Sequence, residues 1–130
     1  MATGRSPIGF LEAVCYDVAD IDRAAAFWSG LLGCTFGRST QTGFRRAQLP
    51  SGLYFLLQQS DEPKTGKNRV HVDFETDEMD AAVALVEALG GRALHPVDNG
   101  LAGFWVCADP DGNEFCIGPP ESRPPRDSGQ

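Results

Sequence analysis

The sequence predicts an α+β fold made of two related modules, each with the order strand, helix, strand, strand, strand. Three observations lead to this prediction. Segments that alternate polar and apolar residues, as half-buried strands do, are interrupted twice by amphipathic helical stripes. Each helical stripe is followed by glycine, which commonly ends a helix. The two helical segments also align residue by residue when the first is shifted forward by 58 positions, which indicates an internal repeat.

The first module is expected over about residues 9–60, after a disordered N-terminus at 1–8. Its helix, predicted over 21–32, has the clearest signals, because Asp20 can cap its N-terminus and Gly33 can end it. Apolar residues recur between these caps at helical spacing. Strands are predicted from alternating residue types and intervening turn residues, over 11–18, 34–37, 44–49 and 53–58.

The second module is expected over about residues 68–118, after a polar linker. Its helix is predicted over 81–89, and the run Asp109–Gly112 has the proline and glycine of a tight hairpin turn. The tail at 119–130 is proline-rich and charged, and is predicted to be disordered. The strands of this module are predicted over 68–74, 92–95, 104–108 and 113–117.

His71 is the central residue of the predicted strand 68–74, where it shares a face with Arg69 and Asp73. A neutral imidazole there could bind a metal ion or transfer a proton. The alternative is a hydrogen-bonded core histidine. The shift of 58 positions places Ala13 opposite His71 in the repeat, so a symmetric site would have an imidazole in one module and a methyl group in the other.

Composition limits the classes of partner. The net charge of −7 argues against nucleic acid or an anionic membrane, which require clustered basic residues. No apolar run has the length of a transmembrane helix and the N-terminus lacks the apolar stretch of a signal peptide, so a cytoplasmic protein is expected. The four cysteines lack the spacing of a zinc site and lie in or beside apolar runs, where buried, reduced thiols are expected.

Three motifs together, Asp20–Gly33, Val70–Phe74 and Asp109–Cys116, resemble those of the vicinal oxygen chelate superfamily. This superfamily contains glyoxalase I, bleomycin-resistance proteins, fosfomycin-resistance enzymes and extradiol dioxygenases. The last motif is the most specific, and with Gly66–Arg69 it is similar to the glyoxalase-like branch. The resemblance covers roughly residues 9–118. It implies paired βαβββ modules that form a cup-shaped mixed sheet.

Metal-dependent members of the superfamily take their ligands from the first and fourth strands of each module. By resemblance, these positions fall on Ala13, on Leu56 or Gln58, on His71 and on Cys116, where family enzymes usually carry Glu. Because Ala13 supplies no donor, we expect no cofactor. The alternative is a divalent Zn, Fe, Mn or Ni ion bound through His71. Carboxylates close to the ligand positions could complete such a site, namely Asp17, Asp73 and Glu114.

Two functions follow from the resemblance. The first is metal-free binding of a small organic molecule in the cup, as a carrier or for sequestration as in bleomycin resistance. The alternative is an enzyme, a lyase, isomerase or dioxygenase, that uses His71 as metal ligand or as acid and base with Asp73 or Glu114. A homodimer is expected, because family members commonly pair.

The residues expected to contact the ligand lie at cup-facing strand positions or carry aromatic rings; they are Ala13, Cys15, Trp28, Tyr54, Gln58, Arg69, Trp105 and Cys116. For the aromatic residues, packing in the core is the alternative. Lys67 is expected to be solvated, although together with Arg69 it could bind a carboxylate or phosphate at the rim. His95, which precedes a proline at a predicted strand end, is expected to be a surface or turn residue.

Overall fold

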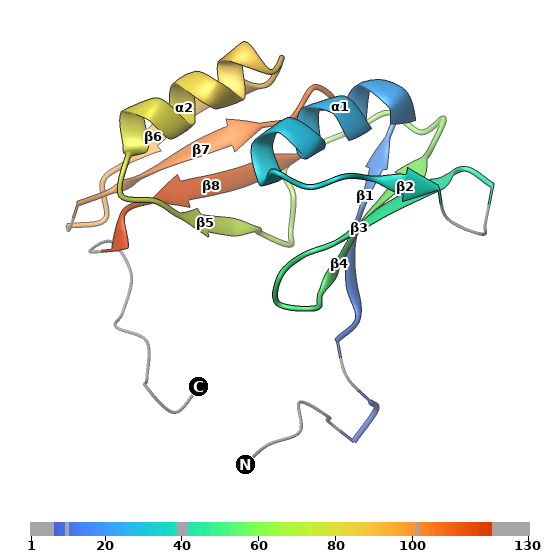
Figure 1. Ribbon diagram of the computed structural model, residues 1–130. Coiled ribbons are helices and arrows are strands. Elements are labelled where there is room, and N and C mark those ends of the chain that lie inside the picture. The colour runs from blue at the N-terminus through green and yellow to red at the C-terminus, as the bar shows by residue number, and fades with distance from the viewer. Residues whose placement is uncertain (1–6, 10, 39–41, 101, 121–130) are drawn as a thin grey trace. The chain divides into compact units, whose positions relative to one another are not determined.

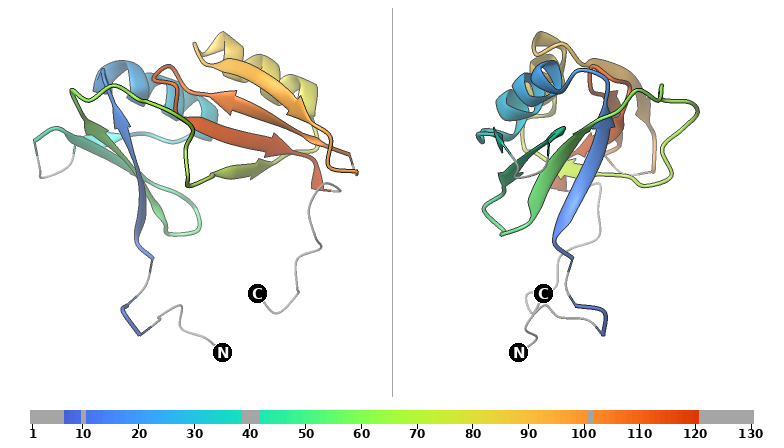
Figure 2. Two further views of the ribbon diagram at one scale, coloured as in Figure 1. Left: turned by 180° about the vertical axis from the view of Figure 1, so that it is seen from behind. Right: turned by 90° about the vertical axis from the view of Figure 1, so that its right-hand side faces the viewer.

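The computed structural model describes residues 7–9, 11–38, 42–100 and 102–120. The chain divides into two compact units, Met1–Glu62 (unit 1) and Pro63–Gln130 (unit 2). Each unit has its own four-stranded sheet, and its helix lies against one face of that sheet (Figures 1 and 2). The predicted α+β fold with a βαβββ order in each half is therefore confirmed. The segments predicted to be disordered, 1–8 and 119–130, lie mostly outside the described residues.

The two units have the same topology. In each sheet the first strand pairs in parallel with the fourth, and the remaining pairs are antiparallel, giving the orders β1-β4-β3-β2 and β5-β8-β7-β6. Unit 1 consists of β1 (Ala13–Val18), α1 (Ile21–Leu32), β2 (Gly37–Arg38), β3 (Phe44–Gln48) and β4 (Tyr54–Gln59). Unit 2 consists of β5 (Asp73–Glu75), α2 (Met79–Ala88), β6 (Arg92–Val97), β7 (Phe104–Ala108) and β8 (Glu114–Gly118).

Helix α1 has the predicted bounds, and side chains satisfy free backbone N–H groups at its start. Asp20 Oδ1 accepts hydrogen bonds from the N–H groups of Asp22 and Arg23, at 3.1 and 3.2 Å. Gln59 Oε1 accepts from the first N–H of the helix at 3.0 Å. At the other end Gly33 has the left-handed φ of 66° that the sequence pattern predicted.

The core of unit 1 is a cluster of aromatic rings behind its sheet. Trp28 has no exposed surface, and its ring centroid lies 5.1 Å from that of Phe27 and 4.8 Å from that of Phe55. Tyr16 and Phe36 pack edge-on against Phe55. The apolar stripe of α1 is thus explained by burial against β1 and β4.

The core of unit 2 contains smaller side chains. Its largest fully buried side chain is Phe115, which packs edge-on against Phe74 with ring centroids 5.7 Å apart. Only Val86 of α2 is buried. Leu85, which the repeat aligns with Phe27, is 42% exposed, whereas Phe27 is 1% exposed. The repeat in sequence is therefore not matched by a repeat in burial. Neither helix of the described chain is long and apolar enough to cross a membrane.

The strand predicted around His71 is shorter than expected. β5 begins only at Asp73, so His71 lies outside the strand, and the prediction of a mid-strand position is wrong. The ladder still reaches Val72, whose carbonyl accepts a hydrogen bond from Cys116 N–H at 2.9 Å. The next hydrogen bond of a parallel ladder would run from Val72 N–H to the carbonyl of Glu114. That carbonyl accepts a bond of 3.2 Å from the side-chain amide of Asn68, which diverts the chain from the sheet.

Pro96 lies inside β6, although the strand was predicted to end before it. β6 is at the edge of its sheet, where the missing N–H of proline leaves no ladder bond unmade. A register shift between Ala93 and His95 adjusts the pairing with β7. The strand therefore continues to Val97.

Asp109 organises the turn between β7 and β8 and is only 2% exposed. Its Oδ1 accepts hydrogen bonds from the N–H groups of Asp111 and Asn113, at 2.9 and 2.8 Å. Its Oδ2 accepts from the side-chain amide of Asn113 at 3.1 Å. The predicted hairpin turn is confirmed, and Gly112 completes it with a φ of +85°. The most specific sequence motif thus has a structural role in this turn.

Replacement of Asp109 by Ala is expected to lower the free energy of unfolding by about 2 kcal/mol, because it leaves two backbone N–H groups of the turn without their acceptor. Urea unfolding followed by circular dichroism measures the change. The matched control is Asp61→Ala, which removes an exposed carboxylate and is expected to stay within about 0.5 kcal/mol of the parent. Equal effects of the two substitutions would contradict the assigned role.

Candidate functional site

A cavity of about 150 Å³ lies on one face of the unit 2 sheet. This is the face opposite α2. Cys107 of β7 lies close enough to Glu87 of α2 for that carboxylate to affect its thiol, so Cys107 points toward the helix. Its neighbour Val106, which lines the cavity, therefore points to the other face. The cavity combines an apolar floor with a polar edge. Its lining residues are Lys67, His71, His95, Val97, Phe104, Val106, Glu114, Phe115 and Cys116.

Strand register explains which side chains meet at this cavity. Val106 of β7 pairs with His95 of β6 on one side and with Cys116 of β8 on the other. Glu114 precedes Cys116 by two residues and so shares its face of the sheet. His71 approaches from the segment that leads into β5, which is the parallel neighbour of β8.

Lys67 and Glu114 form a loose ion pair at the edge of the cavity, with 3.8 Å between Lys67 Nζ and Glu114 Oε1. The lysine side chain is 63% exposed and the glutamate side chain 22%. Such a pair contributes little to stability. The bond from Asn68 to the carbonyl of Glu114 anchors the segment that carries Lys67 against β8. The cavity therefore has an ammonium group, a carboxylate and the imidazole of His71 on its β8 side, and the imidazole of His95 on its β6 side.

The structure brings together three of the predicted site residues, His71, Glu114 and Cys116, in this cavity. Asp73 and Arg69 are exposed and are not among its lining residues. Two further lining residues, His95 and Lys67, were not among the predicted site residues. Both are exposed, as expected, and Lys67 had been considered as an anion-binding residue at the rim. Had the predicted strand been extended through Pro96, the alternation of residues would have placed His95 and Val97 on the same face of the sheet.

The predicted site residues of unit 1 separate into a sheet face and the core. Ala13 and Cys15 of β1 pair with Tyr54 and Leu56 of β4, so these four positions and Gln58 share one face of the sheet. The guanidinium carbon of Arg46 lies 4.8 Å from the centre of the Tyr54 ring on the same face, a cation–π contact. Trp28, in contrast, is fully buried in the aromatic core and is not available to a ligand at the surface.

The donors at the superfamily's metal positions do not fit a divalent ion. Strand register identifies which of Leu56 and Gln58 is equivalent to Cys116. Cys15 pairs with Leu56 in unit 1, and its repeat equivalent Asp73 pairs with Cys116 in unit 2. Leu56 is therefore the equivalent of Cys116. At the two metal-ligand positions unit 1 therefore has the methyl group of Ala13 and the isobutyl group of Leu56, which carry no donor atom. Nowhere in the described ranges do three His, Cys, Asp or Glu side chains gather as metal ligands.

The four cysteines are free thiols. Cys107 and Cys116 are buried and Cys34 is half-buried, but Cys15 is exposed, so the expectation of burial is wrong for that residue. Burial raises the pKa of Cys107 to about 11, with smaller contributions from Cys116 and Glu87. Partial burial and the carboxylate of Asp17 raise the pKa of Cys15. Both groups are therefore protonated, weakly nucleophilic thiols at neutral pH.

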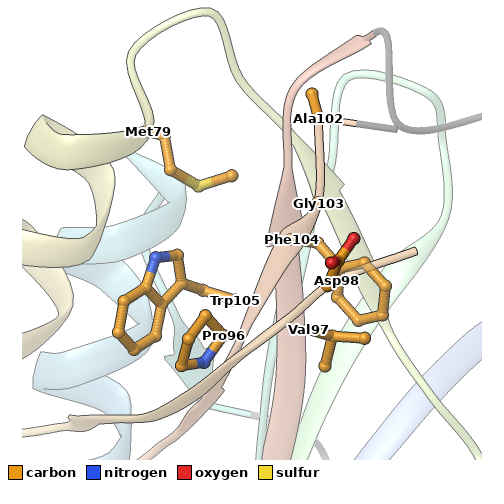
Figure 3. Close-up of a pocket in the computed structure, with 8 residues that line it drawn as sticks. All are labelled: Met79, Pro96, Val97, Asp98, Ala102, Gly103, Phe104 and Trp105. Carbon is orange, nitrogen blue, oxygen red and sulfur yellow. The ribbon is translucent and has the colours of Figure 1, made fainter. Parts of the chain in front are cut away.

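A second cavity in unit 2, of about 470 Å³, lies where β6 ends, β7 begins and α2 starts (Figure 3). Trp105, which was predicted to bind the same ligand as His71, lines this cavity and not the first one. The lining residues are Met79, Pro96, Val97, Asp98, Ala102, Gly103, Phe104 and Trp105. The structure thus separates Trp105 from the group around His71.

The raised pKa of Cys107 predicts a pH dependence of stability. Folding favours the protonated thiol, so its contribution is fully present below its ordinary pKa of 9.0 and is lost as the pH rises through about 11. Between about pH 8 and about pH 10.5, the free energy of unfolding should fall by roughly 2 kcal/mol more for the parent than for Cys107→Ala. Urea unfolding at both pH values measures the difference. Identical slopes for the two proteins would contradict it.

Comparison with known proteins identifies related sequences and folds. A family model described as a glyoxalase-like domain matches residues 13–118. No curated protein matches the chain. A glyoxalase/bleomycin resistance protein from Albidiferax ferrireducens T118 is 23% identical with a TM-score of 0.62, over 82% of this chain and 95% of that chain.

Two further solved structures have similar folds. A mutant of the fosfomycin resistance protein FosX from Listeria monocytogenes, complexed with Mn(II) and 1S,2S-dihydroxypropylphosphonic acid, is 18% identical with a TM-score of 0.69, over 84% of this chain and 87% of that chain. A glyoxalase/bleomycin resistance protein/dioxygenase from Nocardioides is 21% identical with a TM-score of 0.65, over 82% of this chain and 80% of that chain. At these identities the similarity establishes the fold alone.

Proposed function

The chain belongs to the glyoxalase-like domain family of the vicinal oxygen chelate superfamily, and we propose on this basis that it binds a small organic molecule without a metal ion, as a carrier or for sequestration. The observation that carries the proposal is the cavity on the unit 2 sheet. It has apolar walls and a few polar groups around its rim, which is the usual composition of a small-molecule site.

The lining of this cavity indicates the class of ligand. Val97, Phe104 and Val106 form an apolar surface, and a cavity of roughly 150 Å³ accepts a group the size of a benzene ring. Lys67 and the two histidines provide hydrogen-bond donors at the edge. The ligand that fits best is therefore a small aromatic or branched aliphatic acid, with its ring on the sheet and its carboxylate beside Lys67.

The donor set supports the metal-free part of the proposal. Unit 1 has side chains without donor atoms at both positions equivalent to His71 and Cys116. Cys116 itself is 6% exposed and is packed between Phe115 and Ile117, where a cysteine behaves as a small apolar residue. One imidazole alone does not hold a catalytic divalent ion.

Phenylacetate and benzoate are suitable probes for this site, with isothermal titration calorimetry as the measurement. Val106→Phe fills the cavity and is expected to weaken binding at least about tenfold, because the added phenyl ring occupies the volume that the ring of the ligand needs. Leu85→Phe adds bulk at a position of α2 that is 42% exposed and is the matched control. Binding that Val106→Phe leaves unchanged, or that a chelator abolishes, would contradict the proposal.

A second candidate function is acid–base catalysis, because His71 and Glu114 line the same cavity. In this case His71 would remove a proton from a carbon next to the carboxylate of the substrate, and Glu114 would hold the imidazolium that forms. The ion pair with Lys67 keeps the carboxylate of Glu114 at this edge of the cavity. Binding and catalysis use the same site and differ in the fate of the ligand.

Proton NMR of phenylacetate in D₂O distinguishes the two functions. A catalyst would exchange the methylene protons for deuterium, and His71→Ala would slow that exchange by roughly 10²-fold or more. His95→Ala, which removes the other imidazole of the cavity, is the matched control. Recovery of fully protonated phenylacetate after long incubation with the parent protein supports the binding function and argues against proton abstraction.

A further inference from the structure

The second cavity of unit 2 has a composition unlike that of the first. Its described lining contains no Lys, Arg or His and a single carboxylate, that of Asp98. The first cavity carries Lys67 and both histidines of the chain. The two cavities therefore favour ligands of different charge.

The walls of this second cavity suit a cation with apolar groups. Figure 3 shows the indole of Trp105, the ring of Pro96 and the thioether of Met79 on one side, and the ring of Phe104 beside the carboxylate of Asp98 on the other. The face of an indole attracts a cation through its quadrupole. A thioether adds a polarisable contact. Its volume of about 470 Å³ is sufficient for a small organic molecule.

The carboxylate of Asp98 is held in place by its own loop. Its Oδ1 accepts a hydrogen bond of 3.0 Å from Gly100 N–H, which leaves the second oxygen for a ligand. The same loop is tied by a bond of 3.1 Å from Gly103 N–H to Asn99 Oδ1. A side chain at Gly103 would place its Cβ 2.9 Å from the carbonyl oxygen of Val97, so the close approach of the two segments requires glycine.

The charged side chains around the start of α2 also favour a cation. The N-terminus of a helix carries a partial positive charge that opposes a cation. Here Glu78 is the N-cap residue and Asp80 lies in the first turn, so two carboxylates outweigh that partial charge. The net charge of −7 adds a weak attraction for cations.

We propose that the cavity between the start of α2 and the ends of β6 and β7 binds an organic ammonium ion, with its apolar groups against Trp105 and Met79 and its charge beside Asp98. This site adjoins the one proposed for an organic acid, because Val97 and Phe104 line both cavities, and it differs from that site in its charged groups. Strand β7 supplies residues to both: Trp105 lines this cavity, and its neighbour Val106 lines the other.

Benzyltrimethylammonium is the probe, and neopentylbenzene, in which carbon replaces the nitrogen, is its neutral counterpart. ¹H–¹⁵N spectra of the full chain follow the indole N–H resonances of Trp28 and Trp105, assigned with Trp105→Phe. The cation is expected to shift the Trp105 resonance and leave that of buried Trp28 in place. Asp98→Asn is expected to weaken binding about fivefold, and Asp61→Asn, the same change of charge in unit 1, to leave it unchanged.

Equal binding of the neutral counterpart, equal effects of Asp98→Asn and Asp61→Asn, or no shift of the Trp105 resonance at millimolar probe would each overturn the proposal. Val106→Phe separates this outcome from that of the organic-acid site. Val106 lines the first cavity and is not among the lining residues of the second, so binding of benzyltrimethylammonium should persist in this variant. Failure of one site is thus visible independently of the other.

Discussion

Parallel pairing of the first and fourth strands is the constraint on which both units depend. It brings together segments that lie about forty residues apart in sequence and fixes their register through bonds such as that from Cys116 N–H to the carbonyl of Val72. A parallel neighbour can be reached only by a crossover, and α1 and α2 begin that crossover in their units. The helix then covers one face of its sheet, and the cavity around His71 lies on the other face. The position of His71 beside β8 follows from this pairing.

Elements with strong local signals could be predicted from the sequence. The bounds of α1 were predicted correctly because Asp20 and Gly33 act within a single turn of the chain. The extent of β5 could not be predicted, because it depends on a bond between Asn68 and the distant carbonyl of Glu114. The strand that contains His95 was predicted too short, because only its place at the edge of the sheet explains why it continues through Pro96.

The aromatic residues illustrate why the candidate site was only partly predictable. Trp28 and Trp105 were both named as possible ligand contacts, with packing in the core as the alternative. Burial separates them: Trp28 is enclosed by the rings of unit 1, whereas Trp105 retains some exposure and lines a cavity. Which of two aromatic residues fills a core depends on the size of the surrounding side chains. That information comes from contacts across the sheet and is absent from local sequence patterns.

The repeat has divided its roles between the two units. Unit 1 buries five aromatic rings and keeps only small or neutral groups at the positions that the superfamily uses for ligands. Unit 2 has a sparser core, with Leu85 exposed where unit 1 buries Phe27, and carries both cavities. Within unit 2, alternation along β7 directs Trp105 and Val106 to opposite faces of one sheet. Because one cavity has a lysine and two imidazoles around it and the other a carboxylate with aromatic walls, a single four-stranded sheet can distinguish an acid from an ammonium ion without any change in fold.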